Sequence, residues 1–276
     1  MADLLRKINR PRVGLALSGG AARGMAHIGV LRALEENAIP IDAIAGASAG
    51  ALVGGLYAAG LSIAQLEAMA RKFRWRHMGR IGFSRLGLQS SAPMETFLRA
   101  NLPVTRFEDL KIPFAALATD LRNGTAVALR DTGDIPLAIR ASNCLPAFYV
   151  PVRDPEGRLL VDGGLVANLP ISYTRDLGAD IVIAVDVGAD GARFMDAPQT
   201  ALGVLTQVFV AVERVVSQQQ ASTADVIIIP KVGHIRWDQS RRAEELMKIG
   251  HEAALASIDQ IKTMIDRRTL LLNSAA

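Results

Sequence analysis

The sequence has one cysteine, few aromatic residues and no continuous hydrophobic run long enough to cross a membrane. Cys144 is the single cysteine among 276 residues, which excludes an internal disulfide and favours a reducing compartment. Aromatic side chains make up 5% of the residues and hydrophobic ones 50%, so the core must be built from aliphatic side chains and alanine. The longest apolar run, residues 49–61, is interrupted by glycines and falls short of the roughly 18–20 residues of a membrane span.

The chain also has little net charge and no recognisable export signal. Its formal net charge of +4 is too small to indicate a nucleic-acid partner without a concentrated basic patch. Residues 1–12 form a basic N-terminal extension, but no apolar segment follows them as in a secretory signal. We therefore expect a cytoplasmic protein that does not bind nucleic acid, while its oligomeric state stays open.

Apolar runs of strand length alternate with helix-period segments along the chain. In the first helical segment, Ile28, Leu31 and Leu34 recur at the spacing of one helix face. The fully apolar run 181–185 indicates a strand that is covered on both faces of a sheet. The predicted strands cover residues 13–18, 113–119, 125–129, 159–161, 181–185 and 226–229, and one more strand follows Pro40. Residues 226–229 are predicted to form a central strand of the sheet. The predicted helices cover residues 25–36, 62–72, 93–100, 135–142 and 200–220, and a long final helix begins at about Arg241.

This alternation predicts an α/β fold, a single three-layer α/β/α domain with a mostly parallel central sheet. The domain would cover residues 13–232, and a C-terminal helical segment, residues 233–276, would pack on it. Residues 73–92 show no clean period and mix arginines with aromatic side chains, which indicates a flap or lid-like excursion. A right-handed crossover between the first two strands would bring the loops after them to the same sheet edge, where open α/β sheets bind ligands.

One of those loops contains the pattern G-x-S-x-G in Gly46, Ser48 and Gly50. This pattern is typical of a nucleophile elbow, in which the serine lies on a strained strand-to-helix turn and its hydroxyl projects into open space. The helix that begins at the serine would favour negative charge beside its hydroxyl. A small-residue helix start packed against a strand fits the same five residues, so the pattern alone does not decide between the two.

The other loop, residues 19–24, is rich in glycine and can supply backbone amides to a negatively charged group. The competing interpretation is a dinucleotide-binding turn, which requires G-x-G-x-x-G and an acid at the end of the next strand. Ala21 stands at the second glycine position, and the next strand ends in Gly46-Ala47-Ser48 without an acid. The loop is therefore better suited to stabilise an oxyanion than to bind a cofactor.

A serine nucleophile needs a base, and the sequence offers an acid and several histidines. Asp162 ends an apolar strand and is followed by Gly163 and Gly164, so its carboxylate can project from the sheet edge. An ordinary Asp-Gly turn has the same sequence. His234 and His251 come late enough for the chain order of a Ser-His-Asp triad, but that fold needs several strands before its serine. Asp162 is the better candidate.

Taken together, these blocks resemble the patatin-like phospholipase family in order and spacing, over roughly residues 12–230. Each block alone is unspecific, whereas the combination is highly specific. The matching blocks are VGLALSGGAARG at 13–24, AHIGVL at 26–31, GASAG at 46–50 and DGG at 162–164, with Ala141-Ser142 and Leu145-Pro146-Ala147-Phe148 before Pro151, and Asn168 with Pro170.

The resemblance implies a serine acyl hydrolase with a Ser-Asp dyad, no histidine and no metal or cofactor. Ser48 would be the nucleophile and Asp162 the general base, and the reaction would pass through an acyl-enzyme. The substrates would be ester bonds of phospholipids, lysophospholipids or neutral lipids. The backbone amides of Gly19, Gly20 and Ala21 would form the oxyanion hole, with Arg23 and Gly24 beside it.

Two residues depart from the family pattern. Ala21 stands where many members have a third glycine, so a positive φ at this position would cost about 1 kcal/mol. Ala147 replaces a usual glycine near the substrate groove, which bears on chain-length preference.

The expected binding partners are a lipid ester substrate, which the resemblance implies, and a membrane surface, which residues 73–91 suggest. Their arginines and aromatic residues Phe73, Trp75 and Phe83 suit an anionic membrane surface, so we expect peripheral contact at the inner face of the membrane. A solvated loop whose aromatic residues pack inward fits the composition equally well. The functional alternatives are a non-catalytic lipid-binding or regulatory protein that keeps the fold, and a nucleotide-binding regulator.

Overall fold

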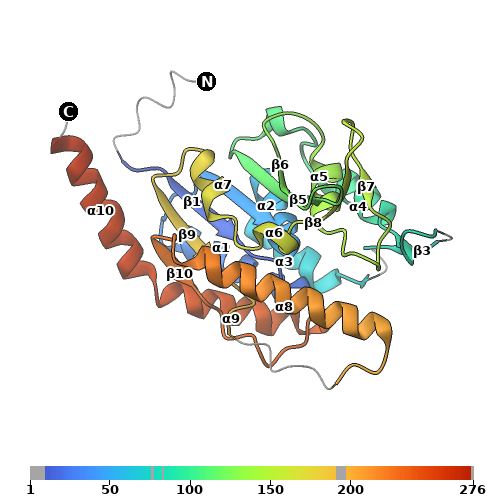
Figure 1. Ribbon diagram of the computed structural model, residues 1–276. Coiled ribbons are helices and arrows are strands. Elements are labelled where there is room, and N and C mark those ends of the chain that lie inside the picture. Colours follow the sequence, from blue (N-terminus) through green and yellow to red (C-terminus); the bar gives the residue numbers. More distant parts are fainter. Residues whose placement is uncertain (1–9, 76–77, 83, 191–196, 275–276) are drawn as a thin grey trace.

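A mostly parallel sheet lies at the centre of the protein, with helices on both of its faces (Figure 1). The structure is a computed structural model and describes residues 10–75, 78–82, 84–190 and 197–274. The strands are β1 (Val13–Leu17), β2 (Ala43–Ala47), β3 (Arg80–Ile81), β4 (Gln89–Ser90), β5 (Phe114–Asp120), β6 (Ala126–Arg130), β7 (Val152–Arg153), β8 (Leu159–Asp162), β9 (Ile181–Val185) and β10 (Val226–Ile228). The helices are α1 (Ala26–Glu36), α2 (Ala49–Ala58), α3 (Ile63–Lys72), α4 (Ala92–Asn101), α5 (Ile135–Ser142), α6 (Gly164–Ala167), α7 (Ile171–Asp176), α8 (Ala201–Ala221), α9 (Ala243–Leu255) and α10 (Ile258–Ser274).

The main sheet has the strand order β10-β9-β1-β2-β5-β8-β7, and its first five strands run parallel. Side chains alternate between two cores, as strand geometry requires. In β1, Leu15 and Leu17 join the large core with α1, α2 and α9, whereas Ala16 joins a smaller core with Ile171 of α7 on the other face. The predicted α/β/α layers and mostly parallel sheet are confirmed.

Strand β5 carries the feature that positions the site, because two strands share one of its edges. One edge of β5 pairs with antiparallel β6 over its whole length. Along the other edge, parallel β2 ends with Ala47 opposite Leu117, and antiparallel β8 ends with Asp162 opposite Ala118. The carboxyl ends of β2 and β8 therefore meet head to head at neighbouring residues of β5.

The C-terminal helices are joined to the sheet domain by a close helix crossing. A side chain on Gly29 of α1 would overlap the backbone of Met247 in α9, and one on Gly250 of α9 would overlap the backbone of Ala26. Two glycines facing each other let the helix backbones approach closely. Helix α9 thus packs on α1 within the same domain, while the boundary at residues 232 and 233 stays a prediction.

Two expectations about individual elements were wrong. Residues 226–228 form an edge strand rather than a central one, because β10 pairs with β9 alone among the described strands, and Ile227 is partly exposed. The long final helix is broken into α9 and α10. Its break lies at Ala256 and Ser257, where Ser257 accepts the first hydrogen bond of α10 from Ile261, at the type of position that serine favours.

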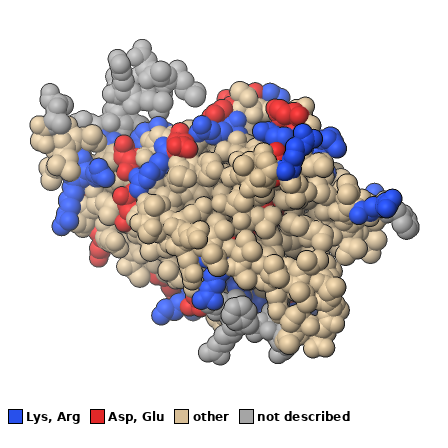
Figure 2. Space-filling view, in the orientation of Figure 1, with Lys and Arg blue, Asp and Glu red and all other residues tan. Residues whose placement is uncertain are grey.

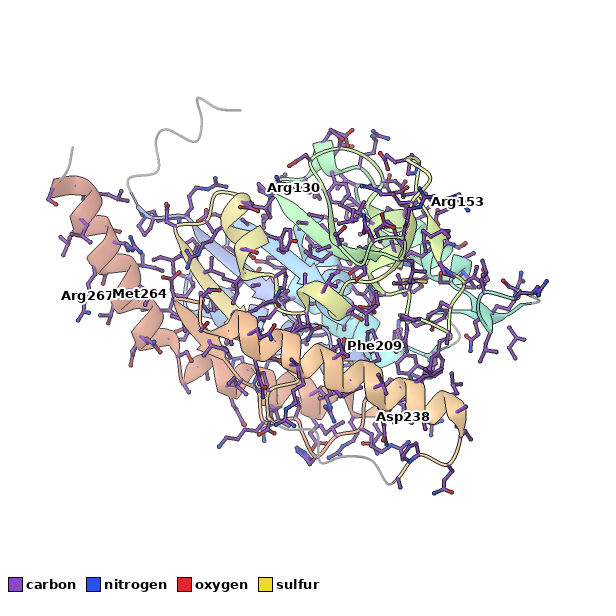
Figure 3. All side chains as sticks on the ribbon, viewed as in Figure 1. Arg130, Arg153, Phe209, Asp238, Met264 and Arg267 are labelled. Carbon is purple, nitrogen blue, oxygen red and sulfur yellow. The ribbon has the colours of Figure 1, made fainter. Side chains whose placement is uncertain are left out.

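The helix predicted at residues 200–220 is present as α8, although several apolar residues along it are exposed. Thr206 and Ser217 are its buried residues, whereas Leu205 and Val208 are 52% and 54% exposed. Helix α8 crosses in front of the sheet (Figure 1), and its residues Thr206, Phe209 and Ser217 border a pocket. By length and composition α8 could cross a membrane, although glutamate and arginine interrupt its apolar sequence. Figure 3 shows Phe209 on the side of α8 that faces the rest of the domain.

Candidate active site

Ser48 lies on a strained turn between β2 and α2. Its backbone has φ 51° and ψ −121°, a left-handed conformation that costs a residue with a side chain of order 1–3 kcal/mol. Gly46 and Gly50 make the turn possible: a side chain on Gly50 would overlap the carbonyl of Leu17, and one on Gly46 would overlap the backbone of Gly50. The turn has the geometry of a nucleophile elbow.

The end of α5 holds this turn in place through two side chains. The backbone N–H of Ser48 donates to Oγ of Ser142 at 2.9 Å, and Nδ2 of Asn143 donates to the carbonyl of Ser48 at 2.9 Å. Sequence reasoning gave these two residues no role. Their position at a helix end was a signal for hydrogen bonding, but the sequence does not show which backbone they would reach.

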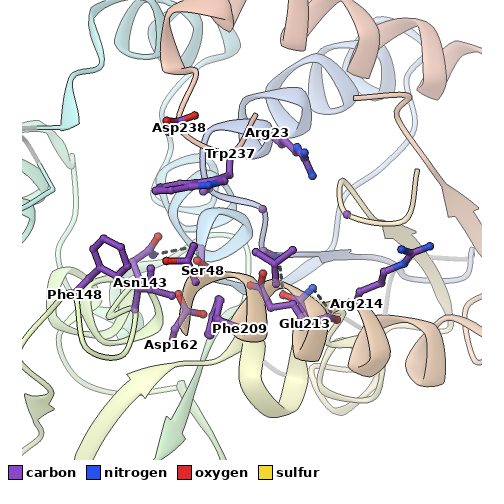
Figure 4. Close-up of a pocket in the computed structure, with 18 of the residues that line it drawn as sticks. Arg23, Ser48, Asn143, Phe148, Asp162, Phe209, Glu213, Arg214, Trp237 and Asp238 are labelled. Atoms are coloured by element: carbon purple, nitrogen blue, oxygen red, sulfur yellow. Dashed lines mark hydrogen bonds between the residues drawn. The ribbon is translucent and has the colours of Figure 1, made fainter. Parts of the chain in front are cut away.

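Asp162 lies beside Ser48 because β2 and β8 meet head to head (Figure 4). Its Oδ1 accepts a hydrogen bond from the backbone N–H of Gly164 at 2.9 Å. Burial raises the pKa of Asp162 to about 7, against the opposing effects of the Gly164 N–H and the Ser48 hydroxyl. Gly163 is needed here, since a side chain on it would overlap the carbonyl of Leu117 and separate β8 from β5.

The glycine-rich loop borders the same pocket, but its amides are not equivalent. The N–H of Gly19 donates to Oδ1 of Asn168 at 3.1 Å, so this amide is already engaged. Within the described parts of the chain, no acceptor is found for the N–H groups of Gly20 and Ala21. Ala21 has φ 51°, which is the strained conformation considered above for a residue that replaces a glycine. Ala147, the second departure, has φ 67°.

Arg23 and Gly24 lie in the turn that follows this loop, Ala21–Met25. Nε of Arg23 donates to the carbonyl of Ile235 at 2.6 Å, and the guanidinium is directed away from Ser48 (Figure 4). Burial lowers the pKa of Arg23, and the nearby charges of Asp190 and Glu213 oppose that effect. A side chain on Gly24 would overlap Ala49, so Gly24 serves the packing of the turn on α2.

The residues above open into a cavity of about 300 Å³ that also contains a second carboxyl group, on Glu213. A methyl group placed on Gly19 would lie 2.8 Å from Oε1 of Glu213 and 3.2 Å from Cβ of Ser48, so one small group would contact both. Burial raises the pKa of Glu213 well above its usual range, and the charges of Asp162 and Asp186 add to the effect. Both effects favour the protonated form of Glu213 beside Ser48 and Asp162.

Sequence reasoning missed Glu213, although a signal was present. Glu213 and Arg214 are the two charged residues in the otherwise apolar and polar-uncharged sequence of α8. An isolated acid on an apolar helix is a candidate site residue because it is costly to bury. Asn168 fixes this side of the cavity, since its Nδ2 donates to Oγ of Ser217 on α8 at 2.8 Å while its Oδ1 binds the Gly19 amide.

Neither the described histidines nor Cys144 borders the cavity, although the carbonyl of Cys144 accepts a hydrogen bond from the backbone N–H of Asp162. His27 is fully buried, with Nε2 2.9 Å from the carbonyl of Ser18, and burial lowers its pKa to about 4. His234 and His251 pair with Glu245 and Glu36, and none of the three borders the cavity. Burial raises the pKa of the Cys144 thiol to about 12, which makes it a poor nucleophile.

Comparison with known proteins identifies the family to which the chain belongs. A family model described as Patatin-like phospholipase matches residues 15–175. The protein named Lysophospholipase nte1 of Emericella nidulans is 35% identical over 195 residues, which cover 67% of this chain and 12% of that protein. An uncharacterized NTE family protein of Mycobacterium bovis is 38% identical over 191 residues, covering 68% of this chain and 52% of that protein.

A solved structure supports the same fold. VipD from Legionella pneumophila matches with a TM-score of 0.54 at 15% identity, over 91% of this chain and 67% of that chain. The chain spans only part of the curated relatives, so the likeness concerns the domain described above and not their remaining length. On the family model and the relatives above 30% identity, this chain belongs to the patatin-like phospholipase family.

Proposed function

We propose that this chain hydrolyses carboxylic ester bonds of lipids (phospholipids, lysophospholipids or neutral lipids) through a Ser48–Asp162 dyad and an acyl-enzyme. The head-to-head meeting of β2 and β8 supports this most directly, because it brings the strained serine and the buried carboxylate together at one cavity. Family membership supports the lipid class, and a relative named as a lysophospholipase supports lysophospholipids within it.

In this mechanism Asp162 accepts the proton of the Ser48 hydroxyl as the oxygen attacks the ester carbonyl. The carbonyl oxygen becomes negatively charged, and we assign its stabilisation to the N–H groups of Gly20 and Ala21, because the Gly19 N–H is held by Asn168. The proton then passes from Asp162 to the departing alkoxide. Water releases the acyl group with Asp162 again acting as the base.

Peripheral contact with a lipid surface is the second part of the proposal. The structure changes which residues of the flap would make that contact. Phe73 and Trp75 pack inward, with Trp75 donating to the carbonyl of Asp238, so they are not free to enter a membrane. Phe83 lies outside the described residues. The exposed apolar residues of the flap are instead Ile81, Leu86 and Leu88, next to the arginines at positions 80 and 85.

A non-catalytic lipid-binding protein is the alternative. It does not account for the strained conformation of Ser48, because such strain persists where the surrounding structure enforces it and is concentrated at active sites. Hydrolysis of a panel of lipid esters with product mass analysis separates the two.

In that assay we expect Ser48→Ala and Asp162→Asn each to reduce kcat/KM by about 10³-fold or more, as for the loss of a nucleophile or its base. His251→Gln is the control and should keep most of the activity, because His251 is paired with Glu36 away from the cavity. A histidine variant as inactive as Ser48→Ala would contradict the dyad.

A further inference from the structure

A second, smaller cavity of about 90 Å³ lies behind the active-site cavity, among helices of the opposite layer. It is bordered by apolar side chains from α1, α2, α3 and α4. Representative lining residues are Ile28, Leu52, Val53, Leu66, Ala70 and Met94. A cavity lined in this way does not hold water and binds apolar groups.

The two polar side-chain donors at its wall, on Asn143 and Trp75, are already engaged. Nδ2 of Asn143 donates to the carbonyls of Ser48 and Ile139, and Nε1 of Trp75 donates to the carbonyl of Asp238. Neither group has to be desolvated further when an apolar ligand enters. The lining also includes several methionines, whose flexible side chains adapt to chains of different length and shape.

Four residues border both cavities: Ala21, Trp75, Met78 and Asn143. Ala21 carries one of the two free amides of the glycine-rich loop, and Asn143 binds the carbonyl of Ser48. The wall between the cavities is therefore formed by the residues that would surround the reacting carbonyl. An ester bound there has two substituents, an acyl chain and an alcohol, which leave its carbonyl carbon in different directions.

The surroundings in these two directions from the ester carbonyl differ in polarity. On the α8 side, the active-site cavity is bordered by the polar residues Thr206, Glu213, Arg214 and Ser217 together with apolar residues such as Phe209. On the other side of Ala21, the lining is apolar. The polar alcohol part of a lipid ester fits the first side, and a hydrocarbon chain fits the second.

We propose that the cavity between α1, α2, α3 and α4 is a subsite for the distal part of a straight fatty acyl chain, which enters past Ala21 and Met78. The proposal rests on the proposed ester hydrolysis and names its acyl-chain specificity site. Acyl chains too short to pass Ala21 do not use the subsite, whereas long chains gain apolar contacts in it.

The test fills the cavity without touching the dyad. Ala70→Leu adds three carbon atoms to a side chain that borders the second cavity alone, and Leu52→Phe fills it from α2 at a less buried position, in case the first variant folds poorly. Ala64→Leu makes the same change on the exposed face of α3 and is the matched control. The readout is kcat/KM for p-nitrophenyl butanoate and p-nitrophenyl dodecanoate.

We expect both filling variants to lower the dodecanoate-to-butanoate ratio of kcat/KM at least tenfold, with butanoate hydrolysis within twofold of wild type and Ala64→Leu unchanged. An unchanged ratio in both folded variants overturns the subsite. If the wild-type protein hydrolyses neither ester, the hydrolase assignment fails instead. Equilibrium binding of a fluorescent dodecanoic acid to the same variants, which needs no turnover, then decides the subsite: tenfold weaker binding supports it and equal binding overturns it.

Discussion

The carboxyl group of Asp162 is buried at the end of β8, and this burial has opposite effects on chemistry and on stability. A pKa of about 7 makes it a much stronger base than a free aspartate, with a proton affinity suited to neutral pH. The same shift means that the folded protein holds the Asp162 proton more tightly than the unfolded chain does. The fold is therefore less stable when Asp162 is ionised.

This linkage predicts the pH dependence of an Asp162→Asn variant. With a pKa of 3.8 unfolded and about 7 folded, wild-type Asp162 gives up stability as the pH rises between those values, by at most about 4 kcal/mol. Asparagine carries no charge and keeps an oxygen for the Gly164 N–H. We expect the Tm of Asp162→Asn relative to wild type to increase from pH 4 to pH 8.

Urea unfolding at both pH values measures the same difference as a free energy. Gln218→Ala, at an exposed position of α8 that carries no titratable group, should show no comparable trend and serves as the control. A constant difference between Asp162→Asn and wild type across this range would mean that Asp162 is not buried in its charged form.

At the level of elements, the site depends on how β2 and β8 share one edge of β5. The sequence predicts that Ser48 and Asp162 each follow an apolar strand, because strand ends and glycine-rich turns are local features. It does not show that β8 runs antiparallel to β5 and stops at Ala118, because that pairing joins residues far apart in the chain. Asp162 was the better candidate base from its place at a strand end, and the resemblance to a family strengthened this link, but neither showed how the two residues come together.

The same distinction explains the other differences from the sequence prediction. Helices whose boundaries are set locally, such as α3 with its Ser62–Gln65 capping box, were predicted well. The edge position of β10 and the exposed apolar face of α8 depend on what packs against them, which periodicity does not reveal. Glu213 was overlooked for this reason, since its importance comes from its closeness to Gly19 and Gly164.

Gly163→Ala tests the junction of the strands. The added methyl group would overlap the carbonyl of Leu117, so the end of β8 has to move away from β5 and carry Asp162 with it. Because small displacements of a catalytic group are costly, we expect a loss of about 10²-fold in kcat/KM while the protein remains folded by circular dichroism.

Gly82→Ala is the matched control, because a methyl group there would meet neighbouring atoms only at ordinary contact distances of 3.8 Å and more. It should leave kcat/KM within about twofold of wild type, a difference too small to reflect a structural change. Equal activity in Gly163→Ala and Gly82→Ala would show that the junction does not position the dyad.

For the whole molecule, the notable surface is the face over α8. Figure 2 shows few charged residues across this face, with Lys, Arg, Asp and Glu gathered at its margins. Val204, Leu205 and Val208 of α8 are about half exposed there, and Ile81 of the flap is 85% exposed. Exposed apolar residues on a face with few charges favour contact with a lipid surface.

We expect Val208→Glu to weaken sedimentation with anionic phospholipid vesicles several-fold without changing the hydrolysis of a soluble short-chain ester. A carboxylate at this position opposes both the apolar contact and the anionic surface. Gln218→Glu adds the same charge at an exposed polar position of α8 and is the control. Equal vesicle binding by wild type and Val208→Glu, or binding that does not depend on anionic lipid, would end the membrane proposal.

If Asp162 activates Ser48 at the junction of β2 and β8, covalent labelling of the serine must depend on that carboxylate. An alkyl fluorophosphonate should add once to the wild-type protein, with the adduct mapped to Ser48 by peptide mass analysis. Ser48→Ala should gain no adduct, and Asp162→Asn should be labelled at least about 10²-fold more slowly, as expected when a serine loses its base. Labelling at another residue, or equally fast labelling of Asp162→Asn, would show that Ser48 and Asp162 do not act as a dyad.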